Sequence, residues 1–140
     1  MNVPSHCQRR TDQPIYKAKT PKAKSTFTLR NPKRASVVVL QPEEFFPAAE
    51  LDCDFVFQVA TAPLELYVEL KGSDILHAID QLDNAIRLLA SPLRPKKCII
   101  VVWQRSPPKS DTQMQNRKLA FERKHRCKLE WKTQHHTLSI

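Results

Sequence analysis

Two carboxylates and a lysine stand at spacings that could bring them to one point. Glu69 and Lys71 are two residues apart in the segment 64–71, which is predicted to be a strand, so their side chains share one face. Asp54 opens the segment 54–60, a second predicted strand, and the short connection between the two predicts an antiparallel hairpin. The start of one strand then lies beside the end of the other. We therefore expect Asp54, Glu69 and Lys71 to converge.

A pair of acids beside a lysine is suited to metal-assisted hydrolysis of a phosphodiester. Mg²⁺ binds hard oxygen ligands, keeps several waters and uses only one or two protein carboxylates. Asp54 and Glu69 are therefore candidate ligands, and the backbone carbonyl of Leu70 is a further one. Such a metal lowers the pKa of a bound water and offsets the charge that builds on the phosphodiester. Lys71 could steady the incipient hydroxide or contact the scissile phosphate.

The residues that follow this strand predict a sharp turn into a helix. Gly72 is the only glycine of the chain. A strand that ends at a reactive site and turns at once favours a residue with conformational freedom, and a glycine would also let a phosphate backbone approach closely. Ser73 and Asp74 are residue types that commonly cap a helix at its N-terminus. Gln81 falls at the border of the apolar face of this helix, where it could reach the site.

The surrounding elements predict a mixed sheet with helices packed on it, an α/β class with α+β character. The segments with β-branched or alternating patterns are 36–40, 54–60, 64–71, 98–103 and, at an edge of the sheet, 128–132. Apolar residues recur at three and four residues over 75–90, and 112–125 is a second predicted helix. The order strand, helix, strand over 64–103 predicts a parallel β-α-β crossover, expected to be right-handed.

The net charge of +9 is divided unevenly along the chain. Residues 1–35 carry nine basic side chains and one acid, residues 36–95 carry three and ten, and residues 96–140 carry eleven and three. Basic ends suit a polyanion such as nucleic acid, and carboxylates between them suit a cation. The candidate nucleic-acid contacts are Gly72, Lys96, Lys97, Arg105, Lys109, Arg117, Lys118, Arg123 and Lys124.

Composition limits the classes that remain. The length suits one domain, and we predict a basic, flexible arm over residues 1–25 followed by a single domain over residues 26–140. No apolar run approaches the ~20 residues of a membrane span, and no signal-peptide core is visible, so a cytoplasmic protein is expected. The four cysteines form no CxxC pair, which favours free thiols over a zinc site or a disulfide framework.

At these residues the sequence resembles the PD-(D/E)XK nuclease superfamily. The resemblance rests on Asp54, on Glu69-Leu70-Lys71 after fourteen intervening residues, and on Gln81 of the next helix. The segment 53–82 looks like small stand-alone hypothetical members, whose relatives include Holliday junction resolvases and restriction endonucleases. The resemblance implies a restriction-endonuclease-like core with a β-hairpin, a β-α-β crossover and flanking helices. It also implies that the Asp and Glu bind Mg²⁺, that the Lys assists the attacking water and that the Gln supports them.

Two positions depart from the pattern of that superfamily. Cys53 stands before Asp54 where members carry proline, and Asp52 is an alternative first ligand. Many members also have an acid on a helix before the first core strand. Glu43 and Glu44 follow the predicted strand 36–40, so they are not counted among the candidates.

The resemblance implies a Mg²⁺-dependent endonuclease in which a metal-activated water attacks the phosphodiester, with Mn²⁺ as a possible substitute. DNA is favoured over RNA as the partner, no membrane is expected, and the protein could act as a homodimer, paired through the edge strand, or in a larger complex. The alternative is a catalytically silent nucleic-acid-binding or interaction protein on the same fold, because a fold does not fix a function.

Overall fold

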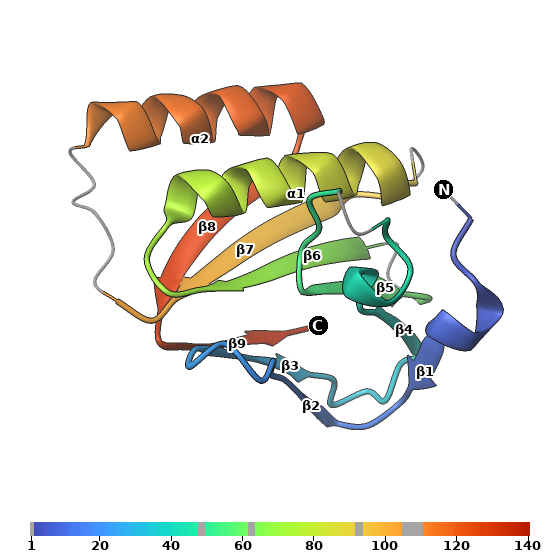
Figure 1. Ribbon diagram of the computed structural model, residues 1–140. Helices are drawn as coiled ribbons and strands as arrows, with labels where there is room; N and C mark the ends of the chain where they lie inside the picture. The colour runs from blue at the N-terminus through green and yellow to red at the C-terminus, as the bar shows by residue number, and fades with distance from the viewer. Residues whose placement is uncertain (1, 48–49, 62–63, 92–93, 105–110) are drawn as a thin grey trace.

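A computed structural model describes residues 2–47, 50–61, 64–91, 94–104 and 111–140. Within these ranges the protein has three layers: two α-helices, a six-stranded mixed sheet and a three-stranded sheet (Figure 1). This architecture confirms the predicted mixed α/β sheet with flanking helices. Neither described helix is long and apolar enough to cross a membrane.

The six-stranded sheet, called sheet A, has the strand order β1-β4-β5-β6-β7-β8. Its strands are β1 (Arg9–Thr11), β4 (Val37–Leu40), β5 (Phe55–Val59), β6 (Leu64–Lys71), β7 (Lys96–Val102) and β8 (Lys128–Thr133). Sheet B has the order β2-β3-β9 and consists of β2 (Ile15–Ala18), β3 (Thr26–Arg30) and β9 (His135–Ser139). The helices are α1 (Ile75–Leu89) and α2 (Thr112–His125), and the 3-10 turns are η1 (Ser5–Cys7) and η2 (Pro42–Glu44).

The predicted hairpin and crossover are both confirmed. β5 and β6 pair antiparallel, with Phe55 opposite Val68. The chain then passes through α1 into β7, which pairs parallel to β6 with Glu69 opposite Ile100. Because parallel strands point the same way, the C-terminal ends of β6 and β7 lie at the same end of sheet A, at the left of Figure 1. α1 begins there, capped by Asp74, whose carboxylate accepts a hydrogen bond from the backbone N–H of His77 at 3.0 Å.

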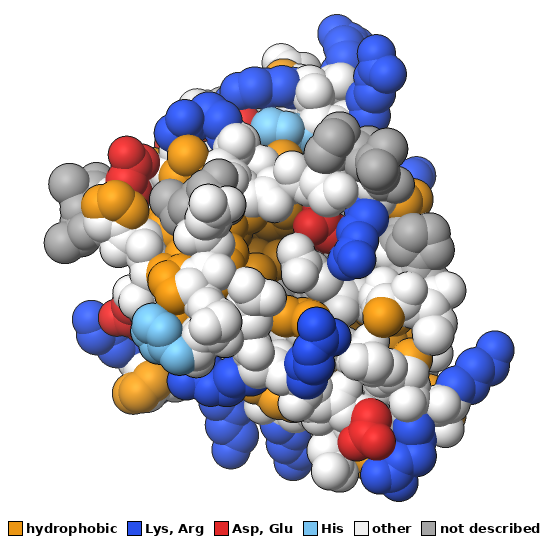
Figure 2. All heavy atoms as spheres, turned by 90° about the vertical axis from the view of Figure 1, so that its right-hand side faces the viewer, with side chains coloured by type: hydrophobic (Ala, Val, Ile, Leu, Met, Phe, Trp, Pro, Cys, Tyr) orange, Lys and Arg blue, Asp and Glu red, His pale blue; other side chains and the backbone are white. Residues whose placement is uncertain are grey.

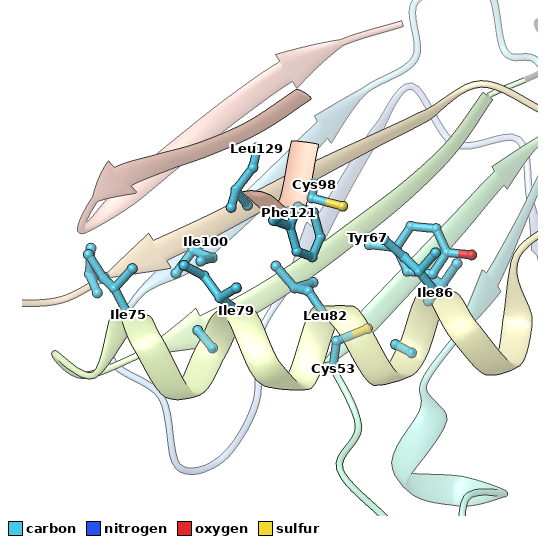
Figure 3. Close-up of a cluster of buried hydrophobic side chains, with 14 of the residues drawn as sticks. Cys53, Tyr67, Ile75, Ile79, Leu82, Ile86, Cys98, Ile100, Phe121 and Leu129 are labelled. Carbon is cyan, nitrogen blue, oxygen red and sulfur yellow. The ribbon is translucent and has the colours of Figure 1, made fainter. Parts of the chain in front are cut away.

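Sheet A is covered on both faces. On one face, Ile75, Ile79 and Leu82 of α1 point at Tyr67 of β6 and Ile100 of β7 (Figure 3). On the other face lies a second core, shared with sheet B. Each buried aliphatic or aromatic side chain of this size contributes roughly 1.5–3 kcal/mol to folding. A strand covered on both sides is apolar along its length, which is why β7 carries the longest apolar run of the sequence.

Sheet B differs from the prediction. The prediction made residues 1–25 a flexible arm, whereas the structure places η1, β1 and β2 in this range. β1 extends sheet A by pairing with β4, and β2 directs Tyr16 and Ala18 toward the second core. β3 and β9 were not predicted either. In β3, Phe27 and Leu29 are buried while Thr26 and Thr28 are partly exposed, an alternation typical of a strand covered on one face only.

Candidate active site

The end of β6 and the start of β5 bring the two predicted carboxylates side by side. Glu69 Oε1 accepts a hydrogen bond from the backbone N–H of Asp54 at 3.1 Å, and Asp54 Oδ2 accepts one from the backbone N–H of Leu70 at 2.8 Å. Each carboxylate therefore binds a backbone amide of the other strand at the end of the hairpin ladder. This reciprocal arrangement fixes the position of both side chains.

Lys71 and Gln81 complete the cluster. Lys71 Nζ lies 3.5 Å from Glu69 Oε2 and donates a hydrogen bond to Gln81 Oε1 at 2.6 Å. The side-chain amide of Gln81 donates in turn to the backbone carbonyl of Asp52 at 2.9 Å. Gln81 thus connects α1 with the segment that leads into β5 and holds the ammonium group in place.

All four side chains line one open cleft of about 710 Å³. The cleft is bounded further by residues 20–24 of the loop between β2 and β3, by Glu43 of η2, and by Trp103 and Gln104 after β7. Trp103 donates its backbone N–H to the carbonyl of Lys71 at 2.8 Å, so the end of β7 stays attached to the end of β6. The cleft therefore lies at the C-terminal ends of the two parallel strands, a place where α/β sheets commonly bind ligands.

Burial and mutual repulsion disfavour the charged forms of the Asp54 and Glu69 carboxyl groups. Glu69 is 2% exposed. Burial and the neighbouring Asp54 carboxylate raise the pKa of Glu69 to about 9, although Lys71 acts in the opposite direction. Burial also raises the pKa of Asp54, against hydrogen bonds and Lys71 that lower it. Two carboxylates that are buried together favour either a bound proton or a bound cation.

The donor set fits a hydrated Mg²⁺ ion. The carboxyl groups of Asp54 and Glu69 lie within hydrogen-bonding reach of each other, so their oxygens converge, and Lys71 Nζ lies 3.5 Å from Glu69 Oε2. Leu70, whose carbonyl is the further predicted ligand, also lines the cleft. No cluster of three or more His, Cys, Asp or Glu side chains able to hold a metal occurs in the described part of the chain. Mg²⁺ does not need one, because it retains several waters and uses one or two carboxylates.

Asp54, and not Asp52, is the acid that faces the cleft. Asp54 lines it, whereas Asp52 contributes a backbone carbonyl to Gln81. Burial and then the charge of Asp54 raise the pKa of Asp52.

Glu43 is a cleft residue that sequence reasoning set aside. It lies on η2 and lines the cleft with Asp54, and its charge contributes to raising the pKa of that carboxyl. Its neighbour Glu44 points elsewhere and pairs with Arg9 of β1. In the sequence, Glu43 and Glu44 form an acidic pair directly after the predicted strand 36–40. Their spacing alone does not predict that this turn reaches the cleft at the end of β6.

Gly72 corrects one expectation about the turn. It lines the cleft, but its φ is not positive, and a Cβ placed on it would have no heavy atom within 4 Å. The turn from β6 into α1 therefore does not require a glycine. Gly72 lines the cleft, and the space around its Cα is open.

The basic residues nominated for nucleic-acid contact are dispersed. Lys96 and Lys97 lie at the start of β7, at the end opposite to the cleft. Arg123 is exposed on α2. Arg105 and Lys109 lie outside the described residues. Among the described residues, Lys96, Lys97 and Arg123 do not line the cleft.

The other basic residues of α2 have partners on the protein. Arg117 pairs with Asp80 of α1 at 2.6 Å, and Lys124 pairs with Asp83 at 2.9 Å. The ammonium group of Lys118 lies 5.8 Å from the centre of an aromatic ring of β8. Instead, the basic residues at the cleft come from the loop between β2 and β3, which contributes Lys22 and Lys24.

Comparisons with family models, with curated proteins and with solved structures find no match for this chain.

Proposed function

We propose that this protein is a Mg²⁺-dependent nuclease that hydrolyses phosphodiester bonds of DNA, with Mn²⁺ as a substitute metal. One observation carries the proposal. Two largely buried carboxylates, Asp54 and Glu69, are fixed side by side next to Lys71 in an open cleft with a basic wall. A protein that only binds nucleic acid gains nothing from this pair, because uncompensated carboxylates repel a phosphate.

Each residue of the cluster has a role in this proposal. Asp54, Glu69 and the carbonyl of Leu70 would hold the metal, which supplies a lowered pKa for a bound water and stabilises charge on the phosphate. Lys71 would donate hydrogen bonds to the attacking water or to a phosphate oxygen. Gln81 would hold Lys71 in position through the 2.6 Å hydrogen bond to its ammonium group. Glu43 lies in the same cleft and would add negative charge toward the cation.

The test is a cleavage assay with single variants of the cleft and matched variants outside it. Labelled linear duplex, single-stranded and four-way-junction DNA, together with RNA, would be incubated with Mg²⁺ or Mn²⁺, and with EDTA as the metal control. Asp54→Asn and Lys71→Ala should each reduce cleavage by about 100-fold or more. The matched controls are Asp12→Asn and Lys128→Ala, both at exposed positions outside the cleft, which should cut like the unmodified protein.

The outcomes separate the proposal from its alternative. Cleavage that needs metal and is lost only in the two cleft variants would support the nuclease. Binding of DNA without cleavage under every metal condition, unchanged in both cleft variants, would contradict it and favour a catalytically silent binding protein.

A further inference from the structure

Sheet B has a second face that points away from sheet A. Phe27 and Leu29 of β3 are buried in the core shared with sheet A, so the alternate side chains of this strand point outward. In Figure 1 sheet B is the lowest layer, and no described element lies beneath it. Its outer face is formed by Ile15, Lys17, Thr26, Thr28, Arg30, His135, Thr137 and Ser139.

The strand register gathers these side chains into rows. Lys17 is opposite Thr28 across β2 and β3, and Thr28 is opposite Thr137 across β3 and β9. The next row places Arg30 opposite Ser139. Neighbouring rows lie about 6.8 Å apart along the strands, because alternate residues share a face. Ammonium, guanidinium and hydroxyl groups of this kind are the side chains that contact phosphate oxygens in protein–nucleic acid complexes.

The segments that form sheet B contain no Asp or Glu. Residues 13–42 contain seven Lys or Arg and no Asp or Glu, and no Asp or Glu follows Glu130. Among the described residues neither Lys17 nor Arg30 forms an ion pair, whereas Arg117 and Lys124 of α2 each pair with an acid of α1. Figure 2 shows Lys and Arg side chains at the lower margin of the molecule, on the side of sheet B, as well as at the upper margin, on the side of α2.

The outer face of sheet B is continuous with the cleft. The loop between β2 and β3 borders the cleft with residues 20–24 and leads directly into Thr26. The ring of Trp103, which also lines the cleft, packs edge-on against the ring of His135 with centroids 5.8 Å apart. Nδ1 of His135 lies 2.7 Å from the hydroxyl of Thr26. A chain of polar and aromatic side chains therefore connects the catalytic end of β7 with the first row of the outer face.

We propose that DNA bound in the cleft continues past Trp103 along the outer face of sheet B. Lys17 and Arg30 neutralise phosphates there, and the hydroxyl groups of the neighbouring strands donate hydrogen bonds to them. This inference rests on the proposed function, because the cleft defines where the DNA enters. It moves the main binding surface away from the basic residues predicted from the sequence, four of which lie on α2, to the layer on the side of the molecule opposite α2.

The chemistry of the face favours DNA over an anionic membrane. A helix or sheet that binds a membrane surface inserts a group of apolar or aromatic side chains between the headgroups. Ile15, 59% exposed, is the one large apolar side chain of the described strands that is exposed on sheet B. Hydroxyl and basic groups dominate the rest.

The experiment measures affinity for DNA without metal, so that binding is read independently of cleavage. A short fluorescein-labelled DNA duplex would be titrated in EDTA at several salt concentrations. The double variant Lys17→Ala/Arg30→Ala should weaken binding by about tenfold and reduce the magnitude of the slope of log K against log salt by about two. The matched control, Arg123→Ala/Lys128→Ala, removes one Arg and one Lys from exposed positions on α2 and β8 and should leave both quantities unchanged.

Several outcomes would overturn the inference. These are an equal loss of affinity in both double variants, a loss only in the α2–β8 control, or no measurable affinity in the unmodified protein. Thermal unfolding of each variant shows whether it is folded, and Lys17→Arg/Arg30→Lys, which keeps both charges, should retain affinity. Tighter binding to vesicles of anionic lipid than to the duplex would also overturn it. Binding lost in Lys17→Ala/Arg30→Ala, with no cleavage under any metal condition, would sustain this surface and contradict the nuclease.

Discussion

The Glu69 carboxylate illustrates how burial can prepare a single residue for a cation. In the unfolded chain this group would titrate near 4.5, whereas in the folded protein its pKa is about 9. Its contribution to stability is therefore fully present below about pH 4.5, decreases as the pH rises, and is lost as the pH passes about 9. The raised pKa favours the protonated form of Glu69 at neutral pH, and a cation bound in the cleft, as proposed, would have to displace that proton.

Glu69→Gln is expected to stabilise the metal-free protein. The amide keeps the shape of the side chain but has no charge to bury, so the free energy of unfolding in EDTA at about pH 8 should rise by about 1–3 kcal/mol. The difference should shrink toward zero at about pH 4.5, where the buried carboxyl is protonated. Denaturant unfolding at both pH values measures this. A destabilised Glu69→Gln at the higher pH would show that the carboxylate is not under electrostatic strain.

Gly72→Ala distinguishes a backbone role from a role in substrate approach. A methyl group at this position meets no heavy atom within 4 Å and requires no unusual φ. Stability should therefore change by no more than about 0.5 kcal/mol. Cleavage should fall, by about tenfold, because the methyl group projects into space that the phosphate backbone would use. Unchanged cleavage would mean that DNA does not approach this residue closely.

At the scale of elements, the sequence identified those with strong patterns. The apolar run of β7 and the regular spacing of α1 follow from burial on two faces and on one face respectively. The candidate cluster could be predicted because Glu69 and Lys71 share a strand and Asp54 opens the paired one. Those relations are local and depend only on strand geometry.

The elements that could not be predicted depend on contacts between distant segments. β3 pairs with β9, more than a hundred residues later, with Thr26 opposite His135. Each of these strands is short, is covered on one face and alternates apolar with polar or basic residues, so in sequence it looks like a solvated tail. Glu43 belongs to the same class, because η2 reaches the cleft only through tertiary packing.

Phe27→Ala tests whether sheet B is part of the folded core. This side chain is fully buried and packs against Phe57 of β5, with ring centroids 5.8 Å apart. Truncation should cost about 3–5 kcal/mol, as for other buried aromatic residues. Thr28→Ala, the next residue on the outer face, should cost less than about 0.5 kcal/mol. If both variants lowered the stability measured by thermal unfolding by the same small amount, β3 would not be part of the folded core, and the N-terminal segment would be a loosely attached arm.

At the scale of the whole molecule, charge is arranged by layer. The acids of α1 neutralise basic residues of α2, and Asp54, Glu69 and Glu43 gather at the cleft. On the opposite side, Lys17 and Arg30 of sheet B form no ion pair with any described residue. This arrangement matches the proposal of a polyanion on one outer layer and a cation in the cleft beside it.

If the cleft binds Mg²⁺ as proposed, metal binding competes with proton binding there, and the stability of the fold depends on both. Mg²⁺ must displace the proton held by Glu69, so its effect should grow as the pH rises toward about 9. We expect Mg²⁺ to raise the thermal midpoint of the unmodified protein by several degrees at about pH 8.5 and by much less at about pH 6. Scanning calorimetry at both values, with Glu69→Gln and Asp54→Asn as variants that should lose the shift, measures this coupling. A shift of equal size at both pH values, or one that persists in Glu69→Gln, would mean that the ion binds elsewhere on the protein and that the two carboxylates are held for another purpose.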